Sequence, residues 1–287
     1  MAIVQVSSAD DIDIERENRT EKDHEYFETL DEVFNAYTWR ALFSLMNRGV
    51  VDQILGPLSQ GKEARVILAK DREGTRIALK IYYTTTSTFI KSRYKYIMGD
   101  PRFKNKRIKK DIIDIVEAWS RKEFGNLSAA YRAGVKAPRP IAVERNILAM
   151  EFIGEGSRPA PTLNDLGIDG LDDPDEVFWE ILRNVERTYV LAKLVHADLS
   201  EFNVLYHNGD IRIIDWGSAV KREHPLAFEY LARDLDNVFR FFGVRLEGRQ
   251  VASLIAERAG EPYEEDEDGW LVVKGKRLYE VIDEAFS

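Results

Sequence analysis

Three side chains that could bind a metal ion and align a reacting group are close together in the second half of the sequence. Asp198 and Asn203 belong to the stretch His-Ala-Asp-Leu-Ser-Glu-Phe-Asn at 196–203, and Asp215 follows in Ile-Ile-Asp-Trp-Gly at 213–217. A nucleotide triphosphate needs its charge neutralised and its nucleophile aligned, and two carboxylates with an amide can do both. This spacing indicates phosphoryl transfer. The alternative is an ordinary surface hairpin, in which the acidic residues would lie in turns and have no catalytic role.

A β-hairpin is expected to position these groups. The dipeptide Asn-Gly at 208–209 suits a two-residue hairpin turn, and it has a β-prone run of five residues on each side. In that pairing Asn203 lies opposite Ile214. Asp215 is then a diagonal neighbour of Asn203, so one cation could reach both side chains. Asp198 lies on the loop just before the hairpin, where it can face the reacting hydroxyl or water.

A lysine and a helical glutamate upstream could serve the same reaction. Ile-Ala-Leu-Lys at 77–80 matches the pattern of a strand whose lysine reaches nucleotide phosphates. Apolar residues at three- and four-residue steps predict a helix over 111–133, and Glu123 falls on its apolar stripe. A buried carboxylate needs a cation, so we expect an ion pair between Glu123 and Lys80. The alternatives are an edge-strand lysine and a glutamate that stays hydrated at the rim of the stripe.

The loop that would cover the nucleotide departs from the usual glycine-rich pattern. The segment Leu-Ser-Gln-Gly-Lys-Glu-Ala at 58–64 has a single glycine, Gly61. A lone glycine more often marks a turn than a phosphate cradle, but this one lies between two β-prone runs, one strand before Lys80. Ser59 and Lys62 could supply donors that backbone amides alone would otherwise give.

Six motifs occur in an order that resembles the RIO family of atypical protein kinases, and its type-one branch in particular. The resemblance covers roughly residues 30–245, which makes coincidence implausible. The motifs are Ser-x-Gly-Lys-Glu-Ala at 59–64, Leu-Lys-Ile-Tyr at 79–82, Lys-Glu-Phe-x-Asn-Leu at 122–127, Met-Glu-Phe-Ile-Gly at 150–154, His-x-Asp-Leu-Ser-Glu-x-Asn at 196–203 and His-Pro-x-Ala-x-x-x-Leu at 224–231.

This resemblance implies a chemistry and a set of site residues. ATP and Mg²⁺ would be the cofactors, and Mn²⁺ could replace Mg²⁺. Asp198 would be the catalytic aspartate, and Asp215 would hold the metal with Asn203 and could itself accept the phosphoryl group. The nucleotide contacts that the family implies are Lys80 on the phosphates, Glu123 holding that lysine, backbone groups of Glu151 and Ile153 at the adenine and the side chain of Met150 behind it.

The resemblance also implies an α+β fold, namely an abbreviated two-lobed protein-kinase-like fold. Its first lobe would be an antiparallel sheet with a helix, and its second lobe would be mainly helical. We expect a polar lead over 1–24, a helical extension over 25–49, the first lobe over 50–153 with a basic insertion at 84–110, and the second lobe over 154–287.

Further elements follow from apolar periodicity. We expect strands near 50–58, 64–70, 75–83 and 141–152, and helices near 175–195 and 225–242. On the last of these helices Asp234 could accept amides of the loop that carries Asp198, or it could be an ordinary solvated acid. The acidic run at 264–268 is expected to be a solvated turn.

The segment 91–110 points to a macromolecular partner. It has nine basic residues against one acid, with Tyr94, Tyr96 and Phe103 interleaved, in a chain of net charge −9. Such a pattern suits phosphate-backbone binding with base stacking, so we expect contact with a pre-small-subunit ribosomal particle or its RNA, as the family resemblance implies. The alternative is a solvated loop whose charges merely oppose an acidic body.

The motif Asp-Trp-Gly at 215–217 leaves the substrate open. The type-one branch more often lacks this glycine, and Ile-Asp-Trp-Gly also resembles aminoglycoside and choline kinases. A small-molecule phosphotransferase and a nucleotide-sensing assembly scaffold are therefore alternatives to an ATPase or serine/threonine kinase. The loop at 59–63 and the insertion at 84–110 argue against the small-molecule enzyme.

Composition limits the remaining possibilities. The 287 residues are 44% hydrophobic, which is enough for a sizeable core. The absence of cysteine excludes disulfides and thiol chemistry, and four scattered histidines argue against a zinc cluster; His196 is expected to be structural. No stretch suits a membrane span, so we expect a cytoplasmic protein whose oligomeric state the sequence leaves undefined.

Overall fold

The computed structural model describes residues 35–84 and 111–286 of the chain. The lead expected at 1–24, the first part of the helical extension and the basic segment 91–110 lie outside the described residues. No helix within the described ranges is long and apolar enough to cross a membrane.

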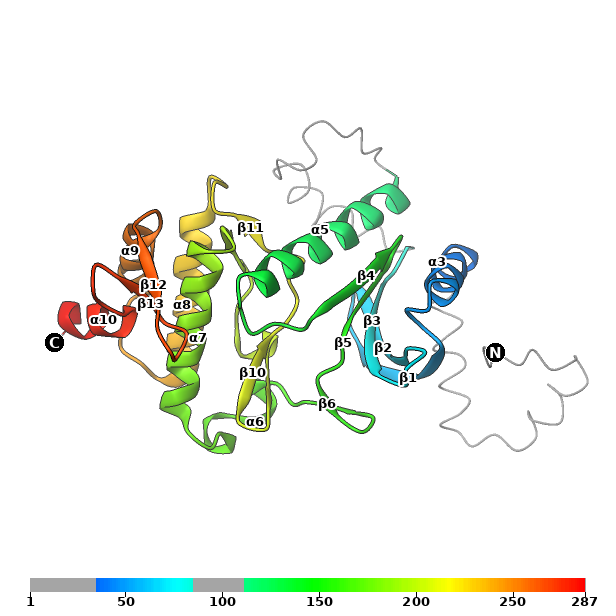
Figure 1. The fold of residues 1–287 in the computed structure, drawn as a ribbon, viewed down its shortest axis with the longest axis horizontal. Coiled ribbons are helices and arrows are strands. Elements are labelled where there is room, and N and C mark those ends of the chain that lie inside the picture. Colours follow the sequence, from blue (N-terminus) through cyan, green and yellow to red (C-terminus); the bar gives the residue numbers. More distant parts are fainter. Residues whose placement is uncertain (1–34, 85–110, 287) are drawn as a thin grey trace, which may run out of the picture. The chain divides into compact units, whose positions relative to one another are not determined.

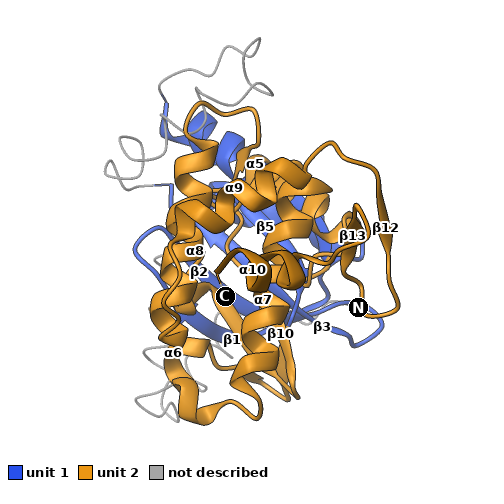
Figure 2. Cartoon of the chain, turned by 90° about the vertical axis from the view of Figure 1, so that its left-hand side faces the viewer, with its two compact units in different colours: residues 1–94, 108–121, 140–152 blue, residues 95–107, 122–139, 153–287 orange. Residues whose placement is uncertain are grey.

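The chain divides into two compact units, which Figure 2 shows in different colours. Of the described residues, the first unit takes 35–84, 111–121 and 140–152, and the second takes 122–139 and 153–286. The predicted division into lobes after residue 153 stays a prediction.

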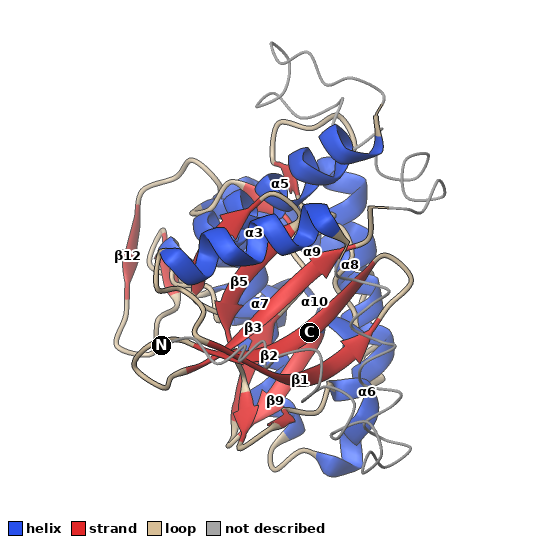
Figure 3. Cartoon of the chain, turned by 90° about the vertical axis from the view of Figure 1, so that its right-hand side faces the viewer, coloured by secondary structure: helices blue, strands red, loops and turns tan. Residues whose placement is uncertain are grey.

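The first unit is built on an antiparallel sheet of five strands in the order β1-β2-β3-β5-β4 (Figure 3). Its described elements are α3 (Ala36–Asn47), β1 (Gln53–Gln60), β2 (Ala64–Lys70), β3 (Arg76–Tyr82), β4 (Pro140–Glu144), β5 (Ile147–Glu151) and the first part of α5 (Ile112–Arg132). Asn35 caps the start of helix α3, because its side-chain oxygen accepts the backbone amides of Tyr37 and Thr38 at 3.1 and 3.0 Å.

One face of this sheet forms a core with α3. Alternate residues of β3, Ile77, Leu79 and Ile81, are buried in one cluster with Leu42 and Leu45 of α3. Because successive side chains of a strand point to opposite faces, Lys80 projects from the other face of the sheet. Strand β3 lies between β2 and β5, so the alternative of an edge-strand lysine is wrong.

The second unit is mainly helical. Its helices pack around short strand pairs, and Figure 1 shows α7 and α8 side by side. The elements are the second part of α5, β6 (Gly154–Glu155), β7 (Arg158–Pro159), α6 (Leu163–Leu166), η2 (Ile168–Gly170), α7 (Pro174–Val190), β8 (Leu194–Val195), η3 (Glu201–Asn203), β9 (Val204–His207), β10 (Asp210–Ile213), β11 (Val220–Lys221), α8 (Ala227–Phe242), α9 (Gly248–Arg258), β12 (Tyr263–Glu265), β13 (Leu271–Val273) and α10 (Leu278–Phe286).

Local signals explain the two long helices of this unit. Helix α7 begins with Pro174 after Asp173, whose side chain accepts the amide of Glu176 at 3.0 Å. Helix α8 ends at Gly243, which has a positive φ of 68°. The sheet of the first unit and the helices of the second agree with the predicted α+β class.

The segment after α8 differs most from the expectations. Helix α9 was not predicted, and the acidic run at 264–268 is not a freely solvated turn. Its first two residues belong to β12, and the second of them, Glu265, pairs with Arg187 of α7 at 2.7 Å. Deeper in the unit, Glu186 of α7 forms an ion pair with Arg258 of α9, and both side chains are buried. Burial raises the pKa of Glu186 to about 6, against the opposing effect of Arg258.

Candidate active site

The predicted hairpin is present and has the expected register. Strands β9 and β10 pair antiparallel from Asp210 opposite His207 to Ile213 opposite Val204. The next step of the ladder is a hydrogen bond of 2.9 Å from the amide of Ile214 to the carbonyl of Asn203. The turn residues at 208 and 209 both have positive φ angles, 52° and 76°, as a two-residue hairpin of this kind requires.

The loop that carries Asp198 is anchored on both sides of that residue. Ala197 and Leu199 are 3% and 1% exposed, whereas Asp198 between them is exposed. Asp234 of α8 accepts the amide of Ala197 at 2.7 Å and the amide of Leu199 at 3.1 Å. This confirms that Asp234 holds the loop, and Asp198 is thereby presented outward from a fixed backbone.

Two further residues of α8 hold the carbonyl groups of the same loop. Arg233 donates to the carbonyl oxygen of Ala197, and Asn237 donates to that of Leu199 at 2.9 Å. Helix α8 therefore satisfies both the donors and the acceptors around Asp198, which leaves the loop little freedom to change its conformation.

The environment of Asp234 perturbs its titration. Burial raises the pKa of this carboxyl from 3.8 to about 7, although the two amides that it accepts and the nearby Arg233 act in the opposite direction. Its side chain is 1% exposed. Asp234 is therefore a buried group whose charge changes near neutral pH.

Asn203 lies opposite Ile214, the residue before Asp215, and a metal ion shared by the amide oxygen of Asn203 and the carboxylate of Asp215 stays a prediction. The side-chain nitrogen of Asn203 donates to the carbonyl of Asp198 at 2.8 Å, which fixes the amide plane and identifies the other atom as the oxygen. Asp215 is exposed and has a positive φ of 61°. Among the described residues, no three His, Cys, Asp or Glu side chains could form a metal cluster. Magnesium fits this sparse set because it takes most of its ligands from phosphates and water.

Two buried polar residues of α5 hold the segment after Asp215. The ammonium group of Lys122 donates to the carbonyls of Gly217 and Ala219, both at 2.7 Å. The side chain of Asn126, one turn later, donates to the carbonyls of Trp216 and Ala219 at 2.9 and 3.0 Å. These contacts fix the turn that follows the metal-binding candidate. This role of Lys122 and Asn126 was not expected from the sequence, although their spacing of four residues, which places them on one face of the helix, could have indicated it.

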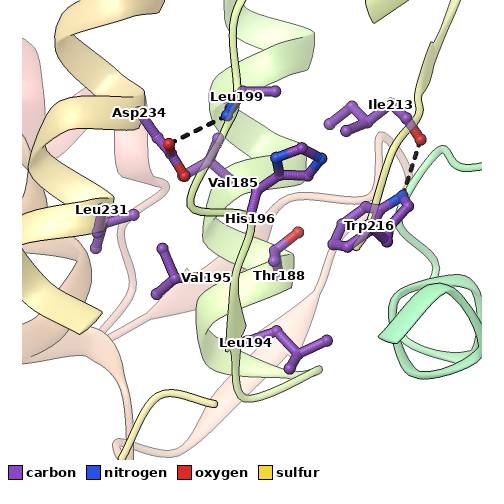
Figure 4. Close-up of a pocket in the computed structure, with 10 residues that line it drawn as sticks. All are labelled: Val185, Thr188, Leu194, Val195, His196, Leu199, Ile213, Trp216, Leu231 and Asp234. Carbon is purple, nitrogen blue, oxygen red and sulfur yellow. Dashed lines mark hydrogen bonds between the residues drawn. The ribbon is translucent and has the colours of Figure 1, made fainter. Parts of the chain in front are cut away.

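His196 is structural, as expected. It is 4% exposed, its ring meets that of Trp216 edge to face at 4.9 Å, and its Nε2 lies 3.0 Å from the carbonyl oxygen of Ile214. His196 is one of the residues that line a small cavity of about 10 Å³, and Figure 4 shows the side chains of these residues. A cavity of this size is at the lower limit for a single water molecule, so it is no substrate site.

The first unit brings several of the expected nucleotide contacts to one face of its sheet. Strand pairing sets Ser59 opposite Val66, Val66 opposite Lys80, and Met150 opposite Ala78. Directly paired residues share a face, and Ala78 shares its face with Lys80. The structure therefore places Ser59, Lys80 and Met150 together on the face opposite α3.

The remaining expected contacts have a less defined placement. Lys62 is exposed in the turn between β1 and β2, and Glu151 is the last residue of β5. The carbonyl of Ile153 accepts the amide of Ala160 at 3.0 Å, so that carbonyl already has a partner. Glu123 is 2% exposed, so the alternative of a hydrated rim glutamate is wrong, whereas its pairing with Lys80 stays a prediction.

Known proteins are similar to this chain over most of its length. A family model described as RIO domain matches residues 65–253. The RIO-type serine/threonine-protein kinase Rio1 of Haloferax volcanii is 40% identical over 249 residues, which cover 86% of this chain and 83% of that protein. The human serine/threonine-protein kinase RIO1 is 38% identical over 214 residues, which cover 75% of this chain but 37% of the human protein.

Solved structures show the same fold. A crystal structure described as the Rio2 kinase-ADP/Mg²⁺-phosphoaspartate complex from Chaetomium thermophilum has a TM-score of 0.62 and 22% identity, and it covers 89% of this chain and 73% of its own. A second structure of Rio2 kinase from that organism has a TM-score of 0.56 and 25% identity over 74% of this chain and 63% of its own. The predicted two-lobed kinase-like architecture is confirmed at the level of the fold.

Proposed function

Because the chain belongs to the RIO family of serine/threonine-protein kinases, we propose that it transfers the γ-phosphoryl group of ATP with Mg²⁺ and that Asp198 aligns the acceptor. The chain is a phosphotransferase. The proposal concerns the residues of the site and the acceptor of the phosphoryl group. This acceptor is a serine or threonine hydroxyl, water, or a residue of the chain itself.

One observation carries this proposal, namely the anchoring of the loop around Asp198. Asp234 and Asn237 occupy the backbone groups of Ala197 and Leu199, so the exposed carboxylate of Asp198 extends from a rigid loop. A group that only has to orient a nucleophile gains most from such rigidity, because misplacement by about 1 Å can cost about a hundredfold in rate.

The other candidate residues would have complementary roles in the proposed reaction. Asn203 and Asp215 would hold Mg²⁺, which neutralises phosphate charge when it is bound. Lys80, steered by Glu123, would contact the phosphates, with Ser59 and Lys62 as further donors. Met150, Glu151 and Ile153 would surround the adenine.

Asp215 is also the candidate phosphoacceptor. Its carboxylate oxygen would attack the γ-phosphorus, the bond to the β,γ-bridging oxygen would break, and ADP would leave; water would later hydrolyse the acyl phosphate. Support comes from the Rio2 kinase structure, which is described as containing ADP, Mg²⁺ and phosphoaspartate. The chain would then act as an ATPase.

The biological setting is proposed from the family resemblance and the charge of one segment. We place the protein in the cytoplasm, where it would act in the maturation of the small ribosomal subunit. The nine basic residues in segment 91–110 would contact ribosomal RNA.

Asp198→Asn tests the central role. The substitution removes the charge without changing the shape of the side chain, so we expect ATP turnover to fall by about a hundredfold or more. The affinity for ATP with Mg²⁺, measured by calorimetry, should change little, because the proposed contact is made in the transition state.

Asp169→Asn is the matched control. Asp169 is an exposed aspartate of η2 in the same unit, and its variant should keep full turnover. Equal losses of turnover and of ATP affinity in Asp198→Asn would contradict the aligning role. Turnover stimulated by amino-sugars or amino-alcohols above the rate in water would favour the small-molecule enzyme.

A further inference from the structure

A second hollow lies within the second unit, among residues that the proposed phosphoryl transfer does not use. Its volume is about 380 Å³. Helix α7, the turn between β12 and β13, and α10 surround it, and these elements lie beside one another in Figures 1 and 2. The residues that line this groove are Glu176, Trp179, Glu180, Arg183, Asp268, Trp270 and Tyr279.

Three aromatic rings give the groove an apolar side. Trp270 and Tyr279 meet edge to face with their centroids 5.2 Å apart, and Trp179 meets them at 6.5 and 5.9 Å. Each ring packs against the other two, so the cluster is rigid. Trp270 is 8% exposed, while Trp179 and Tyr279 are half-buried and present part of their surface to the groove.

Carboxylates give the groove its charge. Glu176 and Asp268 are exposed, and Glu180 is half-buried. Both acids at the rim belong to acidic stretches, Asp-Asp-Pro-Asp-Glu at 172–176 and Glu-Glu-Asp-Glu-Asp at 264–268. The potential at the rim is therefore negative, which repels phosphate backbones and attracts cationic side chains.

Two guanidinium groups of the chain itself already lie against these rings, Arg183 over Trp270 and Arg277 over Tyr279, with 5.8 Å between the guanidinium carbon of Arg277 and the centroid of the Tyr279 ring. Arg183 lies over the ring of Trp270 with 5.7 Å between its guanidinium carbon and the ring centroid, forms an ion pair with Glu180 and donates to the carbonyl of Asp268. Burial and the neighbouring Arg187 lower the pKa of Arg183, while Asp268 and other acids oppose this effect. The groove thus combines an aromatic face with acceptors in the geometry that a guanidinium needs.

We propose that this groove docks an arginine-rich segment of a partner protein. An arginine of the partner would stack on the exposed part of Trp179, because Arg277 already lies over the ring of Tyr279, and its guanidinium would meet the carboxylates of Glu176 and Asp268. Arginine suits the site better than lysine because its planar group can stack and can pair with two carboxylate oxygens at once. The site is separate from the loop of Asp198, so docking can hold a partner without occupying the reaction centre.

The test measures binding of a fluorescein-labelled peptide of alternating arginine and alanine to the full chain by fluorescence anisotropy. The double variant Glu176→Gln with Asp268→Asn changes two exposed side chains, so its folding should be intact. Its affinity should fall by about five- to tenfold, as expected for two exposed charge pairs. Glu257→Gln, which removes an exposed acid of α9 outside the groove, is the control and should bind like the wild type.

Two further comparisons distinguish the occupants. The same peptide with citrulline in place of arginine should bind at least fivefold more weakly than the arginine peptide if charge drives docking. Replacement of the basic residues between 102 and 110 by glutamine should leave the peptide affinity unchanged. A large gain in affinity in that variant would show that the chain's own basic segment fills the groove, and equal affinity of the double variant and the wild type would place peptide binding elsewhere; either result overturns the proposal.

Discussion

Replacing Asp234 with asparagine probes the anchor of the loop that carries Asp198. In the wild type the two carboxylate oxygens accept the amides of Ala197 and Leu199 at 2.7 and 3.1 Å. Asparagine keeps the shape but offers one oxygen and one nitrogen donor, so one backbone amide would face another donor. At pH 8, where Asp234 is mostly ionised, the variant should lose about 1.5 to 3 kcal/mol in the free energy of unfolding, the contribution of one charged hydrogen bond.

Relative to the wild type, the same variant should lose more of its free energy of unfolding at lower pH. The folded pKa of Asp234 is about 7 and its ordinary value is 3.8. For a group whose pKa is raised by folding, the folded state binds more protons between these values, so this contribution to stability is present at low pH and is lost as pH rises through about 7. Asparagine has no such titration. The difference in free energy of unfolding between wild type and variant should therefore be larger at pH 5 than at pH 8 by about 2.5 kcal/mol.

Urea unfolding followed by tryptophan fluorescence at pH 5, 6, 7 and 8 measures this gap. Subtracting the free energies of unfolding of the two proteins cancels the contributions of the other carboxyl groups, which titrate alike in both proteins. Asp169→Asn again serves as the control and should show a constant, small difference. A gap for Asp234→Asn that stays constant between pH 5 and 8 would show that Asp234 keeps its charge throughout, and the reasoning from burial would be refuted.

Two further substitutions test the metal-binding candidate Asp215 and the turn that follows it. Lys122→Met leaves the carbonyl of Gly217 without the ammonium donor and should lower the free energy of unfolding by about 2 to 4 kcal/mol in urea, whereas the exposed control Lys274→Met should have little effect; equal stability of both variants would argue against this role. Incubation with γ-labelled ATP and Mg²⁺ should give the wild type a phosphate that hydroxylamine removes, and Asp215→Asn should lack it. A label that persists in the variant would put the phosphoacceptor elsewhere.

The sequence predicted those parts of the site that depend on local pairing. The Asn-Gly turn set the register of the hairpin, and counting from it placed Asn203 opposite Ile214, as the hydrogen bond of 2.9 Å confirms. Apolar periodicity placed Asp234 near the buried stripe of its helix. These features could be predicted because strand register and helical faces follow from spacing along one segment.

The missed features depend on contacts between segments distant in sequence. Lys122 reaches carbonyls 95 and 97 residues away, and no local pattern marks those carbonyls. A lysine on a helix usually reaches solvent, so its burial follows from the tertiary fold rather than from its own residue type. The same reason explains why the acidic run at 264–268 was expected to be solvated, since its partner Arg187 lies on a helix far upstream.

The buried pair of Glu186 and Arg258 bears on where this protein can be shortened. Similarity to the RIO domain model ceases at residue 253, inside α9 and before Arg258. A fragment that ends at that boundary would leave the buried carboxylate of Glu186 without its counter-ion Arg258, and it would also lack β12, β13 and α10 of the same unit. The residue at which the family match ends is therefore not a suitable end for a truncated protein. A truncated protein should keep Arg258 and the elements that follow it.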